Sequence, residues 1–134
     1  MKTRPRTLPI LTALLGLLLA CQGLVAGEAP ERIAAYFYAD WCNSCKELDP
    51  KVEAARAELA PDTRTLFVTF DLTDERTRAQ AAMLAGALGL GSVYETHASK
   101  TGFMVVLDAD DNSVLHKVTK TDEVATIRNR FASR

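Results

Sequence analysis

The chain has 134 residues, of which 48% are hydrophobic and 25% are charged, with 16 basic residues against 17 acidic ones. This composition excludes a disordered chain or a repeat array and allows one globular domain. The first 20 residues hold three basic residues and no acidic one, which leaves 13 basic against 17 acidic residues, a net charge of about −4. A mildly acidic domain is a poor candidate for binding nucleic acid, and we expect no such partner.

The N-terminal segment, residues 1–27, is predicted to be an export signal. Lys2, Arg4 and Arg6 precede a mostly apolar run over residues 8–20. A basic region followed by such a run has the build of a secretory signal peptide. The run is shorter than the roughly 20 apolar residues that a membrane-spanning helix needs.

Alternative processing sites follow this run. The sequence Leu-Leu-Ala-Cys at residues 18–21 resembles a bacterial lipobox, in which Cys21 would become the lipidated N-terminus. Cleavage after the small residues at 25–27 would instead release a soluble domain, and an uncleaved N-terminal anchor is the third interpretation. All three place the domain, residues 28–134, in the periplasm, either free or membrane-anchored. Disulfides persist in that compartment.

The first half of the domain predicts a strand, a helix, a strand and a helix. Residues 33–38 form a short apolar run with aromatics, which is typical of a buried strand. Apolar residues then recur at helical spacing along one face: Leu48, Val52, Ala55 and Leu59. Pro50 is expected to kink this helix. A second strand at 66–70 precedes a helix that Thr73 or Asp74 can cap and that runs to about residue 88.

The second half begins with a segment, residues 89–102, that has three glycines and no clean period. We interpret it as a long connection, of the kind that is often functional. Strands at 103–107 and 113–119 flank a turn at 108–112. A last helix shows an apolar face made by Val124, Ile127 and Phe131. The order βαβαββα predicts an α/β domain with a central mixed sheet and helices on both faces.

The main chemical signal is Cys42-Asn-Ser-Cys45, at the junction of the first strand and the first helix. On a helical turn the two sulfurs are close enough for a disulfide. Cys42 lies at the helix N-terminus, where unpaired N–H groups and the helix dipole favour a thiolate. A thiolate attacks disulfides, and Cys45 behind it can resolve the mixed disulfide.

Two other interpretations of the pair remain open. Structural zinc needs two more ligands, and outside the pair the chain offers only Cys21, His97 and His116. A structural disulfide is the second interpretation, although the start of a helix after an aromatic strand is an unusual place for one. His116 alternates with valines on a predicted strand and is expected to be a packing or edge residue.

The segment from Tyr36 to Pro50, Tyr-Phe-Tyr-Ala-Asp-Trp-Cys-Asn-Ser-Cys-Lys-Glu-Leu-Asp-Pro, resembles the active site of the thioredoxin family. The predicted element order matches that fold, so the resemblance covers residues 33–134. Within the family the segment is most similar to the C-terminal periplasmic domain of the bacterial transmembrane disulfide reductase. The resemblance implies that Cys42 is the nucleophile and Cys45 the resolving thiol, in a redox-active Cys42–Cys45 disulfide.

The resemblance also suggests supporting residues. Trp41 would form a flat wall beside the pair, and Lys46 continues the family's Cys-Lys-Glu run. Family members commonly carry a buried acid six residues before the first cysteine, but that position here is Tyr36. Asp49, one turn after Cys45, is a candidate substitute for this base, or else a solvated surface charge. Asp40 is interpreted as a strand-end or capping residue.

A second departure from the family concerns its cis-proline before the third core strand. Thr101-Gly102 occupies that place, and no proline occurs between Pro61 and the C-terminus. Gly102 can adopt unusual backbone angles, so a similar loop shape is possible. In the family this loop binds substrate backbone and discourages metal capture. Its change raises the alternative of a Cu(I) site formed by Cys42, Cys45 and His97.

These observations predict an exported thiol-disulfide oxidoreductase of thioredoxin-like fold, with no cofactor. Its partners would be protein disulfides and a membrane-embedded electron donor, and the resemblance favours reduction over oxidation. Membrane contact is expected only through a lipid anchor at Cys21, and the protein is expected to be a monomer. The alternative is a copper-binding or copper-delivery protein on the same fold.

Overall fold

The computed structural model describes residues 28–132. The predicted signal peptide, the lipidation residue Cys21 and the last two residues of the predicted domain lie outside the described residues. Along the chain the helices and strands are β1 (Arg32–Tyr38), α2 (Asn43–Ala57), β2 (Thr65–Asp71), α3 (Glu75–Ala87), α4 (Gly91–His97), β3 (Phe103–Asp108), β4 (Val114–Thr119) and α5 (Val124–Ala132). All four predicted strands are present, with bounds within one or two residues of those expected.

The four strands form one mixed sheet in the order β2-β1-β3-β4. β1 pairs with β2 in parallel and with β3 antiparallel, and β3 pairs antiparallel with β4. The turn between β3 and β4 contains Asn112, whose φ of 60° is in the left-handed region that asparagine tolerates well. β1 is therefore an inner strand of the sheet, and its C-terminal end leads to the cysteine pair.

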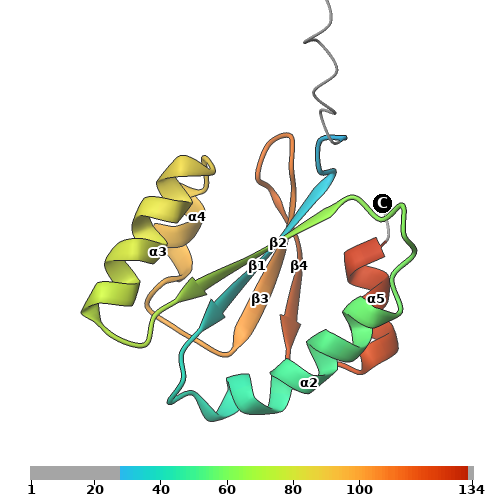
Figure 1. The fold of residues 1–134 in the computed structure, drawn as a ribbon, viewed down its shortest axis with the longest axis horizontal. Helices are drawn as coiled ribbons and strands as arrows, with labels where there is room; N and C mark the ends of the chain where they lie inside the picture. Colours follow the sequence, from blue (N-terminus) through green and yellow to red (C-terminus); the bar gives the residue numbers. More distant parts are fainter. Residues whose placement is uncertain (1–27, 133–134) are drawn as a thin grey trace, which may run out of the picture.

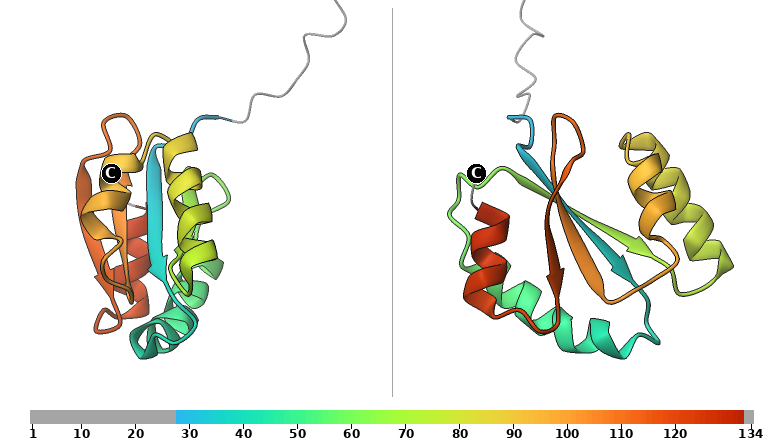
Figure 2. Two further views of the ribbon diagram at one scale, coloured as in Figure 1. Left: turned by 90° about the vertical axis from the view of Figure 1, so that its left-hand side faces the viewer. Right: turned by 180° about the vertical axis from the view of Figure 1, so that it is seen from behind.

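Helices cover both faces of the sheet, as predicted. α3 and α4 pack on one face, and α2 and α5 pack on the other (Figure 1). The rear view shows the sheet between these two helical layers (Figure 2, right). Alternation along β1 separates the two cores, because Ala35 and Phe37 point to the α3–α4 face while Ala34 and Tyr36 point to the α2–α5 face.

α2 begins at the cysteine pair. Its buried residues are Cys45, Leu48, Val52 and Ala55. Leu59, just after the helix, is partly buried against the same core, so the predicted apolar face is confirmed. Pro50 lies inside α2 and does not end it, since the helix continues to Ala57. Lys51 donates from Nζ to the carbonyls of Lys120 and Asp122, at 2.7 and 3.0 Å, which ties α2 to the turn before α5.

α3 starts with the predicted cap. The Asp74 carboxylate accepts the N–H of Thr77 at 2.8 Å, and the Thr77 hydroxyl accepts the N–H of Asp74 at 3.0 Å, which completes a capping box. α3 ends at Ala87, one residue before the expected end.

α4 corrects the prediction for residues 89–102, because this segment is not a structureless connection. It contains a short helix, Gly91–His97, which has no side-chain cap. Burial of Leu90 and Val93 and the edge-on contact of Tyr94 with Phe70, with ring centroids 5.4 Å apart, hold it against α3 and β2. The observed order is therefore βαβααββα. Within residues 28–132, no helix has the length and apolar content to cross a membrane.

Candidate active site

Cys42 and Cys45 lie at the junction between β1 and α2. Cys42 is the N-cap residue of α2, with an extended backbone, and Cys45 lies in the first turn. Both are free thiols in this structure and both are buried, Cys45 completely and Cys42 with 7% of its surface exposed. The predicted position of the pair is thus correct, and only the first cysteine has any contact with solvent.

The environment of Cys42 favours its thiolate. Its Sγ accepts the backbone N–H of Cys45 at 3.3 Å, as a capping side chain does. Burial raises the pKa of the Cys42 thiol, but hydrogen bonds from the side chains of Cys45 and Thr101 and from the N–H groups of Cys45 and Ser44 outweigh it. The pKa of Cys42 therefore lies below its ordinary value.

Cys45 has the opposite environment. Burial, followed by the hydrogen bond to Cys42 and the charge there, raises the pKa of Cys45 to about 11, against smaller effects from the Ala39 backbone and Tyr36. The thiol is therefore protonated at neutral pH. The two thiols in one helical turn therefore differ in how readily they lose a proton, and Cys42 loses its proton at the lower pH.

The loop before β3 closes over the pair. Thr101 hydrogen-bonds the Cys42 sulfur, and the Gly102 N–H donates to the Phe37 carbonyl at 2.9 Å. Gly102 has a φ of +89°, and a Cβ there would lie 2.6 Å from Ser44 Cβ and 3.2 Å from Cys42 Sγ. Only glycine fits this backbone and this space. Thr101-Gly102, predicted to take the place of the family's residue-plus-proline pair, lies directly before β3 and beside Cys42.

A hydrogen-bonded pair, Tyr36 and Asp49, lies next to Cys45. The Tyr36 hydroxyl donates to Asp49 Oδ1 at 2.6 Å and lies 3.4 Å from the Cys45 carbonyl oxygen. The Tyr36 hydroxyl also lowers the pKa of the Cys45 thiol, against the larger effect of burial. Burial and the bonds to Asp49 and Cys45 raise the pKa of Tyr36 far above its usual range, so it stays neutral. Asp49 is half-buried and engaged, not a free surface charge.

Trp41 and Lys46 lie at the outer edge of the pair. Trp41 is 57% exposed, and its indole N–H donates to the Thr73 carbonyl at 3.0 Å, which holds the ring against the segment between β2 and α3. Asp40 lies in the same turn, where its backbone N–H donates to the Thr73 hydroxyl at 3.1 Å. Lys46 is exposed in the first turn of α2, and its N–H donates to the Cys42 carbonyl at 3.3 Å.

The two histidines lie in different places from the cysteine pair. His97 ends α4, and its ring centroid lies 5.6 Å from that of Phe37 and 5.8 Å from that of Phe103. Burial, and then the nearby charge of Lys117, lower the pKa of His97. His116 lies on the edge strand β4, as predicted. Between residues 28 and 132 no three His, Cys, Asp or Glu side chains form a metal-binding group, so His97 is not assembled with the two cysteines.

Tyr36 and Thr73 are the site residues that sequence reasoning missed. In the sequence Tyr36 indicates only the absence of the usual base, although alternation along β1 puts it on the same face as α2. Asp49 is four residues after Cys45, so both lie on one side of that helix. Those two spacings together carry the signal for a Tyr36–Asp49 pair. Thr73 had been noted only as a cap, and no pattern marked it as a partner of Trp41.

The fold and the site define a class: an α/β protein of thioredoxin-like fold, with two cysteines at the start of the helix that follows its central strand. The Thioredoxin family model matches residues 25–87, which include β1, α2, β2 and α3. This match and the mixed sheet confirm the predicted fold class. No curated protein matches the chain.

Proposed function

We propose that this protein is a thiol-disulfide oxidoreductase that uses Cys42 as nucleophile and Cys45 as resolving thiol. The observation that carries this proposal is the asymmetry of the pair. Cys42 has a lowered pKa and a contact with solvent, whereas the pKa of Cys45 is raised to about 11 and its side chain is fully buried. A purely structural disulfide does not require its two cysteines to differ in pKa and exposure.

The reaction follows from this arrangement in two exchanges. The Cys42 thiolate attacks one sulfur of a substrate disulfide, which forms a mixed disulfide and expels the other substrate sulfur as a thiolate. Cys45 then loses its proton and attacks Cys42 Sγ, which forms the Cys42–Cys45 disulfide and releases the second substrate thiolate. The substrate gains two electrons, the protein loses them, and the released thiolates are protonated from solvent.

The Thr101-Gly102 loop and Trp41 supply the substrate surface in this proposal. The loop lies directly beside the Cys42 sulfur, and the exposed Trp41 ring provides an apolar wall next to it. A protein disulfide approaching Cys42 would contact both. Lys46 is the exposed charge nearest in sequence to the pair and would contact the rim of a bound substrate.

The proposed setting is the periplasm, with the first 27 residues as an export signal and Cys21 as a lipid anchor if the lipobox is used. Electrons would come from a membrane-embedded donor, and the working direction would be reduction of protein disulfides. The observed similarity to the thioredoxin family supports the chemistry, and the sequence of the first 27 residues supports the location.

Reduction of insulin by the purified protein, followed by turbidity with a chemical reductant as electron source, tests the activity. We expect turnover by the native protein, none above background by Cys42→Ser, and a stable mixed disulfide with Cys45→Ser. Lys120→Ala is a matched surface control, because it removes a surface charge that pairs with Glu47 at 2.8 Å. Equal activity of the native protein and Cys42→Ser would refute the proposal.

A further inference from the structure

We propose that the Tyr36 hydroxyl carries the proton of Cys45 to Asp49 during the resolving step, so that Tyr36 and Asp49 act as one proton relay. This inference rests on the proposed function, because it concerns how the second exchange occurs. Tyr36 is a positioning and proton-transfer residue here, at the place where the resemblance predicts an acid.

The need for a relay comes from burial. Cys45 is fully buried, so bulk water does not reach its thiol directly. Tyr36 is 7% exposed, and its hydroxyl is close both to Cys45 and to the half-buried Asp49. Its hydroxyl bonds Asp49 Oδ1 at 2.6 Å, a short distance typical of a hydrogen bond to a carboxylate. The same hydroxyl lies 3.4 Å from the carbonyl oxygen of Cys45, which places it next to that residue, and it lowers the pKa of the Cys45 thiol against the larger effect of burial.

An outlet to solvent lies beyond Asp49. A groove of about 360 Å³ runs between α2 and the β1–β2 edge of the sheet, and both Tyr36 and Asp49 line it. A proton received by Asp49 can therefore leave to water in this groove. The groups therefore run from the buried Cys45 thiol through the Tyr36 hydroxyl to a carboxylate, Asp49, that lines the groove.

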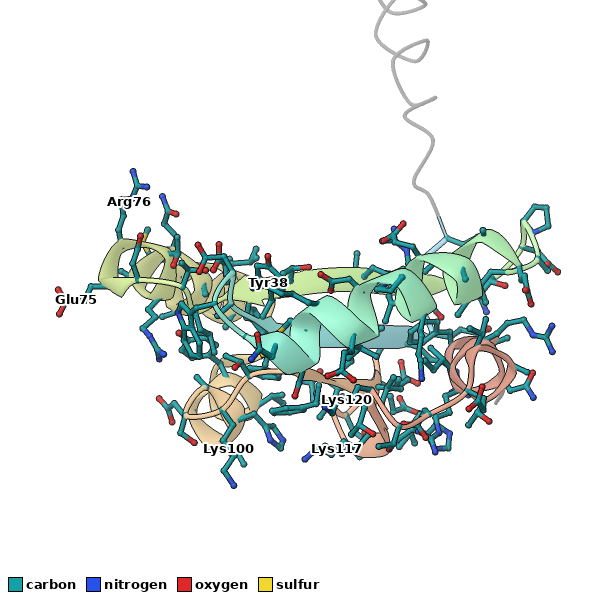
Figure 3. The ribbon with its side chains drawn as sticks, turned by 90° about the horizontal axis from the view of Figure 1, so that it is seen from below. Tyr38, Glu75, Arg76, Lys100, Lys117 and Lys120 are labelled. Carbon is teal, nitrogen blue, oxygen red and sulfur yellow. The ribbon has the colours of Figure 1, made fainter. Side chains whose placement is uncertain are left out.

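Few other charges face these groups. α2 contributes Glu53 and Arg56, which pair with each other at 3.2 Å, and β1 contributes Tyr38. The remaining side chains lining the groove cannot ionise: Val52, Phe67, Val68, Thr69 and Met104. In Figure 3, Tyr38 lies on one side of α2, and Lys117 and Lys120 lie on the other. Asp49 is thus the carboxylate that bonds Tyr36 in this groove.

The proton balance of the step is simple. Tyr36 gives its own proton to Asp49 and accepts the proton of Cys45 through its oxygen, so it is neutral before and after. Cys45 becomes a thiolate and Asp49 a carboxylic acid. The thiolate attacks Cys42 Sγ, the bond to the substrate sulfur breaks, and Asp49 then loses its proton to water.

The disulfide reagent dithiobis(nitrobenzoate) allows the two exchanges to be measured separately, because each exchange releases one coloured nitrothiobenzoate. In stopped-flow mixing with the reduced protein, the first release reports attack by Cys42 and the second reports resolution by Cys45. We expect Tyr36→Phe to leave the first release unchanged and to slow the second by about tenfold or more, as loss of general-base assistance does. Asp49→Asn should slow the same step.

Four further readouts distinguish a relay from a structural role. The double variant should be no slower than the slower single variant, since both belong to one pathway. Asp49→Glu should keep most of the rate. The second release in Tyr36→Phe should recover as pH rises, because hydroxide replaces the relay. Tyr38→Phe removes a hydroxyl from the same groove and should change neither release.

The outcomes separate this inference from the function on which it rests. A native protein that gives no second release, or a Cys42→Ser variant that reacts as fast as the native protein, refutes the proposed function. Two releases in the native protein with an unchanged second rate in both Tyr36→Phe and Asp49→Asn overturn the relay alone. Equal slowing of both releases also overturns it. If Tyr36→Phe fails to fold, Asp49→Asn decides the question.

Discussion

The two faces of the sheet receive neighbouring aromatic residues of β1 and use them differently. On the α3–α4 face, Phe37 is fully buried among the rings of Phe70, Phe103 and His97, with centroids 5.2–5.6 Å away. On the α2–α5 face, the buried Tyr36 hydroxyl bonds Asp49 and lies 3.4 Å from the Cys45 carbonyl oxygen. The α3–α4 face thus contributes packing, whereas the α2–α5 face places hydrogen-bonding groups inside its core. Among the described residues, no buried polar side-chain atom is left without a hydrogen-bond partner.

This contrast separates two kinds of mutational effect. Substitutions on the α3–α4 face should change the free energy of unfolding and leave the thiol chemistry of the folded protein intact. Substitutions around Cys45 on the α2–α5 face should change rates and pH profiles more than stability. The following predictions test the contrast, beginning with the largest effect.

The largest expected effect is the difference in reactivity between the two thiols. Alkylation requires the thiolate. Hydrogen bonds hold the pKa of Cys42 below its ordinary value despite burial, so its reaction rate should fall only when the pH drops below that lowered pKa. Burial raises the pKa of Cys45 to about 11, so its rate should still be rising in strong base. At neutral pH we expect Cys42 to react at least about a hundredfold faster.

Mass spectrometry of the reduced native protein after brief treatment with iodoacetamide measures this difference. One added group per chain, located at Cys42 by fragmentation, is the expected result. Denaturation before alkylation is the control, since it should add two groups or more. Equal labelling of Cys42 and Cys45 in the folded protein would contradict the asymmetry on which the proposed function depends.

Phe37→Ala should give the largest loss of stability. Removing a fully buried ring leaves a cavity among three other rings, which costs about 3–5 kcal/mol of the free energy of unfolding. Urea denaturation of the reduced protein measures it. Met83→Ala on α3 is the matched control, because Met83 is 76% exposed and its loss should change stability by no more than about 0.5 kcal/mol.

The chemistry of the Phe37→Ala variant tests the separation of the two faces. Below the onset of unfolding, the rates of the two exchanges should equal those of the native protein. A slower resolving step in the folded variant would show that the two faces are coupled through β1.

Gly102→Ala should have an intermediate effect on stability and should also alter the chemistry. A φ of +89° costs about 1–3 kcal/mol for a residue with a side chain. The added Cβ also meets Ser44 and the Cys42 sulfur, which should displace the Thr101 hydrogen bond and slow attack by Cys42. Urea denaturation and the rate of alkylation at Cys42 measure the two effects.

Gly89→Ala is a matched control for this variant. Gly89 has a φ of +72°, but an added Cβ there would meet no atom within 4 Å. It should therefore lose stability through backbone strain alone, with Cys42 reactivity unchanged. If both variants change Cys42 reactivity equally, contact of Gly102 with the site is not the cause.

Much of the fold was predictable because its signals are local. The apolar run of β1, the helical spacing of Leu48, Val52 and Ala55, and the cap at Asp74 each define an element by neighbouring residues. α4 was not predictable in this way. It is seven residues long, starts at a glycine and has no side-chain cap, so its stability comes from contacts with α3 and β2 that only the folded chain provides.

The site divides in the same manner. Cys42 and Cys45 can be recognised in the sequence from their spacing and from their position at the start of a helix. The partnership of Tyr36 with Asp49 joins a strand to a helix 13 residues away, and it depends on the register between β1 and α2. The residue type at position 36 alone could not show this partnership, because a tyrosine where an acid is expected indicates only that the acid is missing.

The smallest predicted effect concerns the rim of the groove, where Arg56 lies over the ring of Phe67, with Cζ 4.5 Å from its centroid. Arg56 also pairs with Glu53 at 3.2 Å, but both side chains are exposed, so that pair should contribute little. Arg56→Met keeps the length of the side chain and should cost about 0.5–1 kcal/mol through loss of the cation–π contact. A double-mutant cycle with Phe67→Leu, measured by urea denaturation, isolates the energy of the contact between Arg56 and Phe67.

A coupling energy of zero would mean that this cation–π contact contributes nothing to stability. A change in the resolving step would mean that the charge of Arg56 acts on Asp49, and that the groove is part of the chemistry rather than its outlet.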